Sequence, residues 1–198
     1  MEKLRKIIGW LAFVFPFALI VFGQWPMGKS ISSYYWNNDS VLFVSMLVVC
    51  GSFLVFYDGY DTRDNWMTTV AGVGMMVIAA FPCLGDHWYL FMLIPQGVTN
   101  IIHGVSATIT FGMLGCVSMF QFTQRGSRTT FRKLTRNKIY RICGWVIFGA
   151  MAGIGLIGLF GIREQTDSIR LFFWLESIIL WAFGVSWLVK GGFILEDK

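Results

Sequence analysis

The sequence predicts an all-α membrane protein, a six-transmembrane-helix bundle with the N and C termini in the cytoplasm. Of the 198 residues, 56% are hydrophobic and only 14% are charged, whereas about 25% of the residues of a soluble domain are charged. Six apolar segments approach the roughly 17–25 residues that a helix needs to cross a bilayer. This length and composition indicate one transmembrane domain over residues 1–198.

The six helices are expected at about residues 7–25, 41–57, 67–83, 99–122, 141–162 and 169–190. The first follows a basic start, as in a secretory signal, but no small-x-small cleavage site follows it, so we expect a retained helix. The second and third are short and could be tilted little or extended by flanking aromatic residues. Trp25, Trp36 and Trp88 then fall at the outer interface and Trp66 at the inner one.

The distribution of Lys and Arg predicts the orientation. Three cations precede the first helix, and seven lie between Arg125 and Arg141 in the fourth connection. The first connection has only Lys29, the third has none, and the fifth has Arg163. Because cytoplasmic loops carry the excess of positive charge, we expect connections one, three and five to face outward. The plasma membrane is the expected location, or the inner membrane of a bacterium. The basic loop could bind anionic lipid head groups, and no nucleic-acid partner is expected.

Two ionisable residues inside apolar segments mark a candidate site. Glu176 lies in the apolar run 171–181, where a lone carboxylate costs on the order of 3 kcal/mol and normally faces the bundle interior. With a rise of 1.5 Å per residue, His103 lies about 6 Å and Glu176 roughly 10 Å below the outer ends of their helices. Asp86 and His87, in the third connection, could hang over the same opening.

These positions predict an outward-facing polar pocket that binds a lipid or small amphiphile without catalysis or a cofactor. Its mouth would be lined by Ser33, Tyr34 and Tyr35. A hydrogen bond between His103 and Glu176 that only fixes the helices is an alternative. A metal-assisted lipid hydrolase is another, with His87, His103, Asp86 and Glu176 as mixed ligands, although no HxxxH or HExxH spacing occurs. An oligomeric channel or membrane effector is the third alternative.

Small residues recur in two of the expected helices. Gly149 and Gly153 form a GxxxG in the fifth, and Gly104, Thr108 and Gly112 follow one another at four-residue intervals in the fourth. Such faces let helix backbones approach closely. They indicate packing within the chain or a homo-oligomer formed through helix four or five.

The acidic run 58–64 and the four cysteines are expected to have structural roles. Asp58, Asp61 and Asp64 are expected to form a cytoplasmic ion-pair cluster with Arg63 and the basic fourth connection, with divalent-ion binding as the alternative. The four cysteines, scattered over four helices without CxxC spacing, are expected to pack in the core rather than to form disulfides.

Several stretches resemble a group of small uncharacterised bacterial integral membrane proteins: 30–35, 57–61, 136–141 and 173–191. More distantly, the chain is similar to the six-helix DRAM/Frag/Sfk membrane proteins. In that family, a polar first outer loop accompanies a histidine entering helix four and a glutamate in helix six followed by Ala-Phe-Gly. The matching residues here are His103 and Glu176, and residues 182–184 correspond to the Ala-Phe-Gly that follows the glutamate.

The resemblance implies a six-helix fold with cytoplasmic termini and a role in lipid handling. The first loop here lacks the acidic residue of the eukaryotic motif. A second similarity, to the seven-helix ceramidase/progestin-receptor type of metal hydrolase, is weaker because the paired histidines of a final helix are missing.

Overall fold

A computed structural model describes residues 1–23, 26–36, 40–83, 94–124 and 130–195. Within these ranges the chain forms seven α-helices, one 3₁₀-helix and one π-helix, with no β-strand. The prediction of an all-helical protein is therefore confirmed. In chain order the elements are α1 (Glu2–Phe22), the 3₁₀-helix η1 (Ser32–Trp36), α2 (Ser40–Val55), α3 (Thr62–Ala80), α4 (Gln96–Cys116), the π-helix η2 (Val117–Gln121), α5 (Phe131–Leu159), α6 (Arg163–Asp167) and α7 (Leu171–Lys190).

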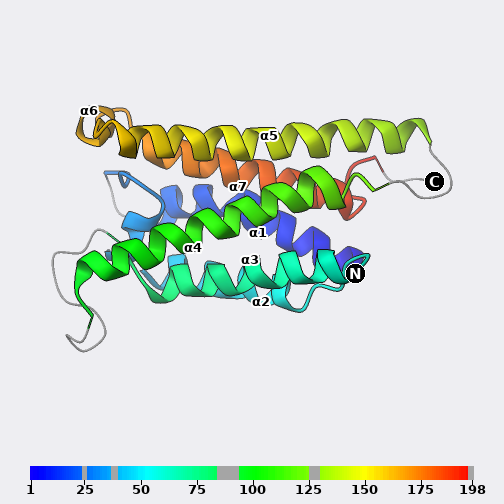
Figure 1. Cartoon of the computed structure of the whole chain (residues 1–198), viewed down its shortest axis with the longest axis horizontal. Coiled ribbons are helices and arrows are strands. Elements are labelled where there is room, and N and C mark those ends of the chain that lie inside the picture. Colours follow the sequence, from blue (N-terminus) through cyan, green and yellow to red (C-terminus); the bar gives the residue numbers. More distant parts are fainter. Residues whose placement is uncertain (24–25, 37–39, 84–93, 125–129, 196–198) are drawn as a thin grey trace.

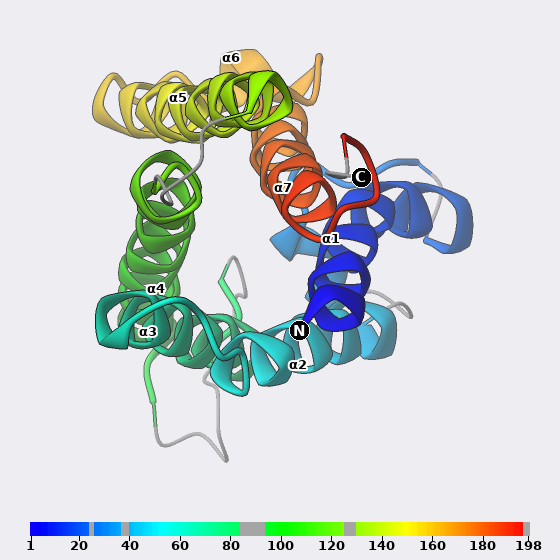
Figure 2. The same cartoon turned by 90° about the vertical axis from the view of Figure 1, so that its right-hand side faces the viewer.

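Six long helices stand side by side in a ring. Figure 2 shows the order α1, α2, α3, α4, α5, α7, with α7 returning to α1. Figure 1 shows that η1 and α6 lie at one end of the bundle, which we call the α6 end. α1 begins and α7 ends at the opposite end, which we call the terminal end. The first and last helices of the chain are thus neighbours.

Four helices of the described chain are long and apolar enough to cross a membrane: α1, α4 continued by η2, α5 and α7. α2 is apolar but shorter, with 16 residues. Large apolar side chains are exposed on the surface of the bundle, among them Val14, Phe17, Val21, Ile101, Ile109, Ile142, Trp145 and Leu156. Polar side chains are buried inside, among them Thr68, Thr110, Ser118, Gln121, Ser177 and Ser186. This distribution is typical of a membrane protein, whose surface meets lipid rather than water.

Two helices begin at polar caps rather than at the edge of an apolar segment. The Thr130 hydroxyl accepts a hydrogen bond from the backbone N–H of Lys133, and α5 starts there instead of at about residue 141. At the start of α3 the Asp61 carboxylate accepts from the N–H of Asp64 at 2.7 Å. Such caps satisfy N–H groups that have no partner within the helix.

The acidic run before and within α3 acts as a set of turn and helix caps. Asp64 is fully buried, and its Oδ2 accepts the backbone N–H of Tyr60 at 3.1 Å. Asp58 accepts from the side-chain amide of Asn65 at 3.2 Å. Asp61 also accepts from Gln124 at 3.4 Å. These hydrogen bonds connect the run to α3 and to the residues that follow η2.

Two glycine pairs bring the backbones of neighbouring helices into close contact. A Cβ added at Gly184 would stand 2.8 Å from the carbonyl oxygen of Gly9, so the backbones of α7 and α1 touch there. A Cβ at Gly51 would stand 2.7 Å from the carbonyl oxygen of Gly72, which joins α2 to α3 in the same way. By contrast, a Cβ at Gly104, Gly112, Gly149, Gly155 or Gly158 would meet no atom within 4 Å.

Candidate functional site

The carboxylate of Glu176 is held by the first connection of the chain. Glu176 lies near the start of α7, toward the α6 end, and its Oε2 accepts the backbone N–H of Ile31 at 2.5 Å. Ile31 precedes η1, whose turn is closed by hydrogen bonds among Ser30, Ser32 and Ser33. A backbone N–H that is buried outside regular structure needs such an acceptor. Glu176 therefore fixes the position of η1 against α7.

His103 is held by a different backbone group, at the end of α3. It lies on α4, is only 8% exposed, and its Nδ1 is 2.9 Å from the carbonyl oxygen of Phe81 at the end of α3. This contact joins α4 to the end of α3. His103 and Glu176 thus each form a hydrogen bond with a backbone group. Their imidazole and carboxylate line the same cavity.

A cavity of about 470 Å³ opens between α4, α5 and α7 near the α6 end. Its polar lining comes from Ser32, Cys83, Asn100, His103, Thr108, Arg163 and Glu176. Its apolar lining comes from Gly104, Ala107, Phe111, Met151, Ile154, Gly155, Phe172 and Ile179. We call this cavity the α4–α5 pocket. Its volume lies within the roughly 300–1,000 Å³ of small-molecule sites.

The shape of the bundle explains why the pocket lies here. Figure 1 shows α4 inclined to α5, so that the two helices separate toward the α6 end. Gly104 on α4 and Gly155 on α5 line the opening, and neither would bring a Cβ within 4 Å of another atom. The lack of side chains at these two positions therefore leaves the space between the two helices open.

A smaller inner cavity borders this pocket. The inner cavity has a volume of about 40 Å³ and is lined mainly by apolar residues of α1, α2, α3, α4 and α7. Ser32, His103 and Glu176 line both spaces. The Ser32 hydroxyl also accepts a hydrogen bond from the Cys83 thiol at 3.2 Å. Ala107 and Phe111 line both spaces as well, so the boundary between the α4–α5 pocket and the inner cavity is made of polar and apolar side chains.

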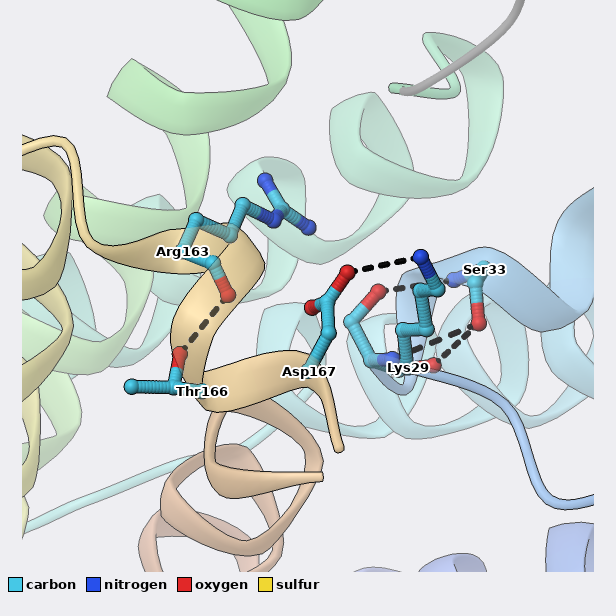
Figure 3. A network of polar contacts seen from close by, with 6 residues as sticks. Lys29, Ser33, Arg163, Thr166 and Asp167 are labelled. Carbon is cyan, nitrogen blue, oxygen red and sulfur yellow. Dashed lines mark hydrogen bonds and ion pairs between the residues drawn. The ribbon is translucent and has the colours of Figure 1, made fainter. Parts of the chain in front are cut away.

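A cation that the sequence analysis assigned only to an outer loop also lines the pocket. Arg163 begins α6, and its guanidinium stacks 4.5 Å from the centroid of the Phe172 ring. α6 is held to the first connection by the ion pair between Lys29 and Asp167, 2.7 Å apart, which Figure 3 shows beside Arg163 and Thr166. The pair is partly exposed at Lys29, so its main effect is to align α6 with η1 rather than to stabilise the fold strongly.

The predicted mouth residues support the site without lining it. Tyr34 is fully buried, its hydroxyl accepts the N–H of Gly28 at 3.1 Å, and its ring packs on Phe173. The Ser33 hydroxyl donates to the carbonyl oxygen of Ser30 at 2.6 Å. Tyr35 packs on Trp36 and Phe43. All three shape the turn that presents Ile31 and Ser32 to Glu176.

Asp86 and His87 lie outside the described residues. The described residues alone contain no group of three or more His, Cys, Asp or Glu side chains that could hold a metal ion. What the pocket offers is hydrogen bonding and charge: a carboxylate acceptor, a guanidinium donor, an imidazole, an amide from Asn100 and hydroxyls.

Neither protein-family models, nor curated protein sequences, nor solved structures give a match to this chain.

Proposed function

We propose that this chain is a six-span protein of the plasma membrane, with both termini cytoplasmic, whose α4–α5 pocket binds a lipid or small amphiphile without catalysing a reaction. The observation that carries the proposal is the pocket itself. Charged and polar side chains from α4, α6, α7 and η1 line one cavity together with apolar side chains of α4, α5 and α7. An amphiphile presents the same division between a polar head and an apolar body.

The orientation is supported by the cations of the described helices. Those near the terminal end include Lys3, Arg5, Lys6, Arg63, Arg132, Lys133, Arg136 and Lys138. The α6 end carries Lys29, Arg163 and Arg170. By the positive-inside rule the terminal end faces the cytoplasm. The α4–α5 pocket then lies in the outer half of the membrane, with α2 and α3 as the two further spans of the ring.

The head group of the ligand should offer both donors and acceptors. Glu176 has one carboxylate oxygen committed to Ile31, and the guanidinium of Arg163 lines the same pocket. A neutral or zwitterionic polar group can bond to both, whereas a strongly charged group of either sign would be repelled by one of them. Asn100 and His103 add a neutral amide and an imidazole to the same wall.

The apolar part of the ligand has a route toward lipid. Exposed apolar side chains flank the pocket on α4, where Val105 and Ile109 face outward, and on α5, where Leu156 does. In the proposed orientation the opening between α4 and α5 faces the bilayer sideways. An acyl chain could then extend from the pocket into the membrane without entering water.

Mass spectrometry of the lipids that co-purify with the protein in mild detergent tests this proposal. Glu176→Gln keeps an oxygen that can accept the N–H of Ile31 but removes the charge. Glu164→Gln, an exposed residue of α6 that does not line the pocket, is the matched control.

We expect a defined lipid in stoichiometric amount in the wild type and in Glu164→Gln, and its loss in Glu176→Gln. Equal amounts of bulk lipid in all three samples would contradict the proposal and leave Glu176 as a structural residue.

A further inference from the structure

The two ionisable side chains at the boundary of the α4–α5 pocket each keep one polar atom for a ligand. His103 and Glu176 line both this pocket and the inner cavity beside it, so they are neighbours. Within the described chain, Glu176 is hydrogen-bonded through Oε2 to Ile31, and His103 through Nδ1 to Phe81. Neither the second carboxylate oxygen nor the second ring nitrogen is among the fully enclosed polar atoms that lack a partner. Both atoms are therefore accessible from the space that the two residues line.

The backbone partner of His103 determines what its second nitrogen can do. A carbonyl oxygen only accepts, so Nδ1 must carry the proton that it shares with Phe81. The carbonyl oxygen of Ile78, three residues earlier on α3, acts on the ring in the same way. His103 is only 8% exposed, and such burial disfavours a charged ring. In the neutral ring Nε2 then has a lone pair, so His103 offers the ligand an acceptor, as the Glu176 carboxylate does.

Two neighbouring acceptors call for a ligand group with at least two donors. A primary ammonium has three N–H donors, whereas a hydroxyl has one. Its hydrogen bond to a carboxylate is also stronger than one between neutral groups. A quaternary ammonium has no donor and would leave both acceptors buried without a partner. A primary ammonium is therefore the group that suits His103 and Glu176 best.

The aromatic lining of the pocket favours the same choice. Quaternary ammonium groups are recognised in proteins by cages of several aromatic rings. Phe111 and Phe172 are the aromatic residues of the described lining. The Arg163 guanidinium already lies 4.5 Å from the centroid of the Phe172 ring. One ring remains, which is too few for a cage.

Arg163 supplies the complement to a phosphate. The Phe172 ring holds its guanidinium in place, and Asp167 on the same short helix pairs with Lys29 at 2.7 Å (Figure 3). A guanidinium binds phosphate oxygens through forked hydrogen bonds. The pocket thus presents acceptors from α4 and α7 and a cationic donor from α6.

We propose that the α4–α5 pocket selects a phospholipid whose head group carries a primary ammonium, of the phosphatidylethanolamine type. The ammonium donates to Nε2 of His103 and to the second carboxylate oxygen of Glu176, and the phosphate accepts from Arg163. This inference rests on the lipid binding proposed above and names the chemistry of the head group.

The test uses the full chain in mild detergent and four phospholipids with the same acyl chains. They are phosphatidylethanolamine, its monomethyl and dimethyl derivatives, and phosphatidylcholine, which carry three, two, one and no N–H donors. Pairs of these lipids are mixed with the protein in known ratios, and native mass spectrometry measures the ratio that is retained. Because each ratio comes from one sample, partial misfolding of a variant lowers both lipids equally.

A hydrogen bond to a charged group contributes about tenfold or more to affinity. The unmethylated and monomethyl lipids can donate to both acceptors and should be retained alike. The dimethyl lipid should be retained about tenfold less, and phosphatidylcholine about a hundredfold less.

His103→Asn should remove one step of this series, because its amide reaches the position of Nδ1 but not that of Nε2. The dimethyl lipid should then match the unmethylated one, and phosphatidylcholine should be only about tenfold weaker. Glu164→Gln, exposed on α6 and outside the lining, should keep the wild-type series.

Equal retention of all four lipids would overturn the selection of an ammonium but leave lipid binding by the pocket intact. Absence of any lipid in stoichiometric amount would overturn both proposals. A preference for phosphatidylglycerol, which has hydroxyls in place of the ammonium, would also overturn this one. A series that persists unchanged in His103→Asn would overturn the role of Nε2 as an acceptor.

Discussion

The carboxylate of Glu176 accepts the backbone N–H of Ile31 at 2.5 Å, across 145 residues of sequence. The last helix thereby holds the turn that follows the first. Because the same carboxylate lines the α4–α5 pocket, the position of η1 and the chemistry of the pocket depend on one side chain. Changes at Glu176 should therefore affect both stability and ligand retention, and the two effects can be separated by the choice of substituent.

Glu176→Ala should lower the free energy of unfolding by about 1–3 kcal/mol, because the buried N–H of Ile31 loses its acceptor. Glu176→Gln should cost less, since its amide oxygen can still accept. Thermal unfolding in detergent, followed by circular dichroism, measures the difference. Glu164→Ala on the exposed face of α6 is the control. Equal midpoints for wild type and Glu176→Ala would show that this hydrogen bond does not stabilise the fold.

Gly155→Leu should fill the opening of the α4–α5 pocket and reduce ligand retention without unfolding the protein. A Cβ at Gly155 would meet no atom within 4 Å, and the residue lines the pocket, so we expect the leucine to extend into the open space. Gly158→Leu, three residues further along α5 and outside the lining, is the matched control. The ratio of bound lipid to protein is the measurement. Loss of lipid in both variants, or in neither, would contradict the location of the pocket.

Gly184→Ala should destabilise the protein by about 1–3 kcal/mol, the usual cost of overpacking a close contact. Its Cβ would stand 2.8 Å from the carbonyl oxygen of Gly9, and backbone atoms cannot move aside as a flexible side chain does. Gly158→Ala should instead stabilise by up to about 1 kcal/mol, because alanine is the better helix former and the position is open. Denaturant titrations of both variants measure the change in the free energy of unfolding, which should be opposite in sign for the two. Equal changes would argue against the α1–α7 contact.

Asp61 should make stability depend on pH in the acid range. The hydrogen bond from the N–H of Asp64 holds the pKa of the Asp61 carboxyl below its ordinary value of 3.8. Since the folded pKa is lowered, the stabilisation is complete above pH 3.8 and is lost as the pH falls through the folded pKa.

Asp61→Asn keeps a capping oxygen but does not titrate in this range, so it should remove this part of the acid dependence. The midpoint of thermal unfolding, measured for both proteins over a series of acidic pH values, tests this expectation. Parallel curves for the wild type and the asparagine variant would contradict it.

Hydropathy predicted the helices well where they are apolar and poorly where they are polar. The sixth apolar segment, expected from about 169 to 190, corresponds to α7 at Leu171–Lys190. α5 instead begins at Phe131, because a capped start and the following Arg and Lys residues form helix readily without being apolar. α6 and η1 are too short to give a periodic signal, and both are fixed by tertiary contacts such as the Lys29–Asp167 pair.

The sequence pointed to the two ionisable residues of the site but could not give their partners. Glu176 and His103 line one pocket, and each forms a hydrogen bond with a backbone group. Every residue has the same backbone groups, so the sequence does not indicate which one will serve as the partner. Ser32 lines the pocket in place of the neighbouring Ser33, because the 3₁₀ geometry of η1 decides which hydroxyl turns inward. Arg163 was missed as a pocket residue because only the folded position of α6 brings it there.

The glycine patterns give the same lesson. The GxxxG at Gly149 and Gly153 was the visible motif, yet the tightest backbone contacts involve Gly9 with Gly184 and Gly51 with Gly72. Close packing requires a facing glycine on a second helix, and a motif within one helix does not show which residue will face it.

The adjacency of α1 and α7 has a consequence for biosynthesis. A ring whose first and last members are neighbours cannot close while the ribosome is still translating α5, because α7 fills the place between α5 and α1. Until α7 is released, the backbone face of Gly9 and the N–H of Ile31 have no partner on α7. Chains halted before Leu171 should therefore be recognised as incomplete by chaperones and proteases, although α1 to α5 have already been made.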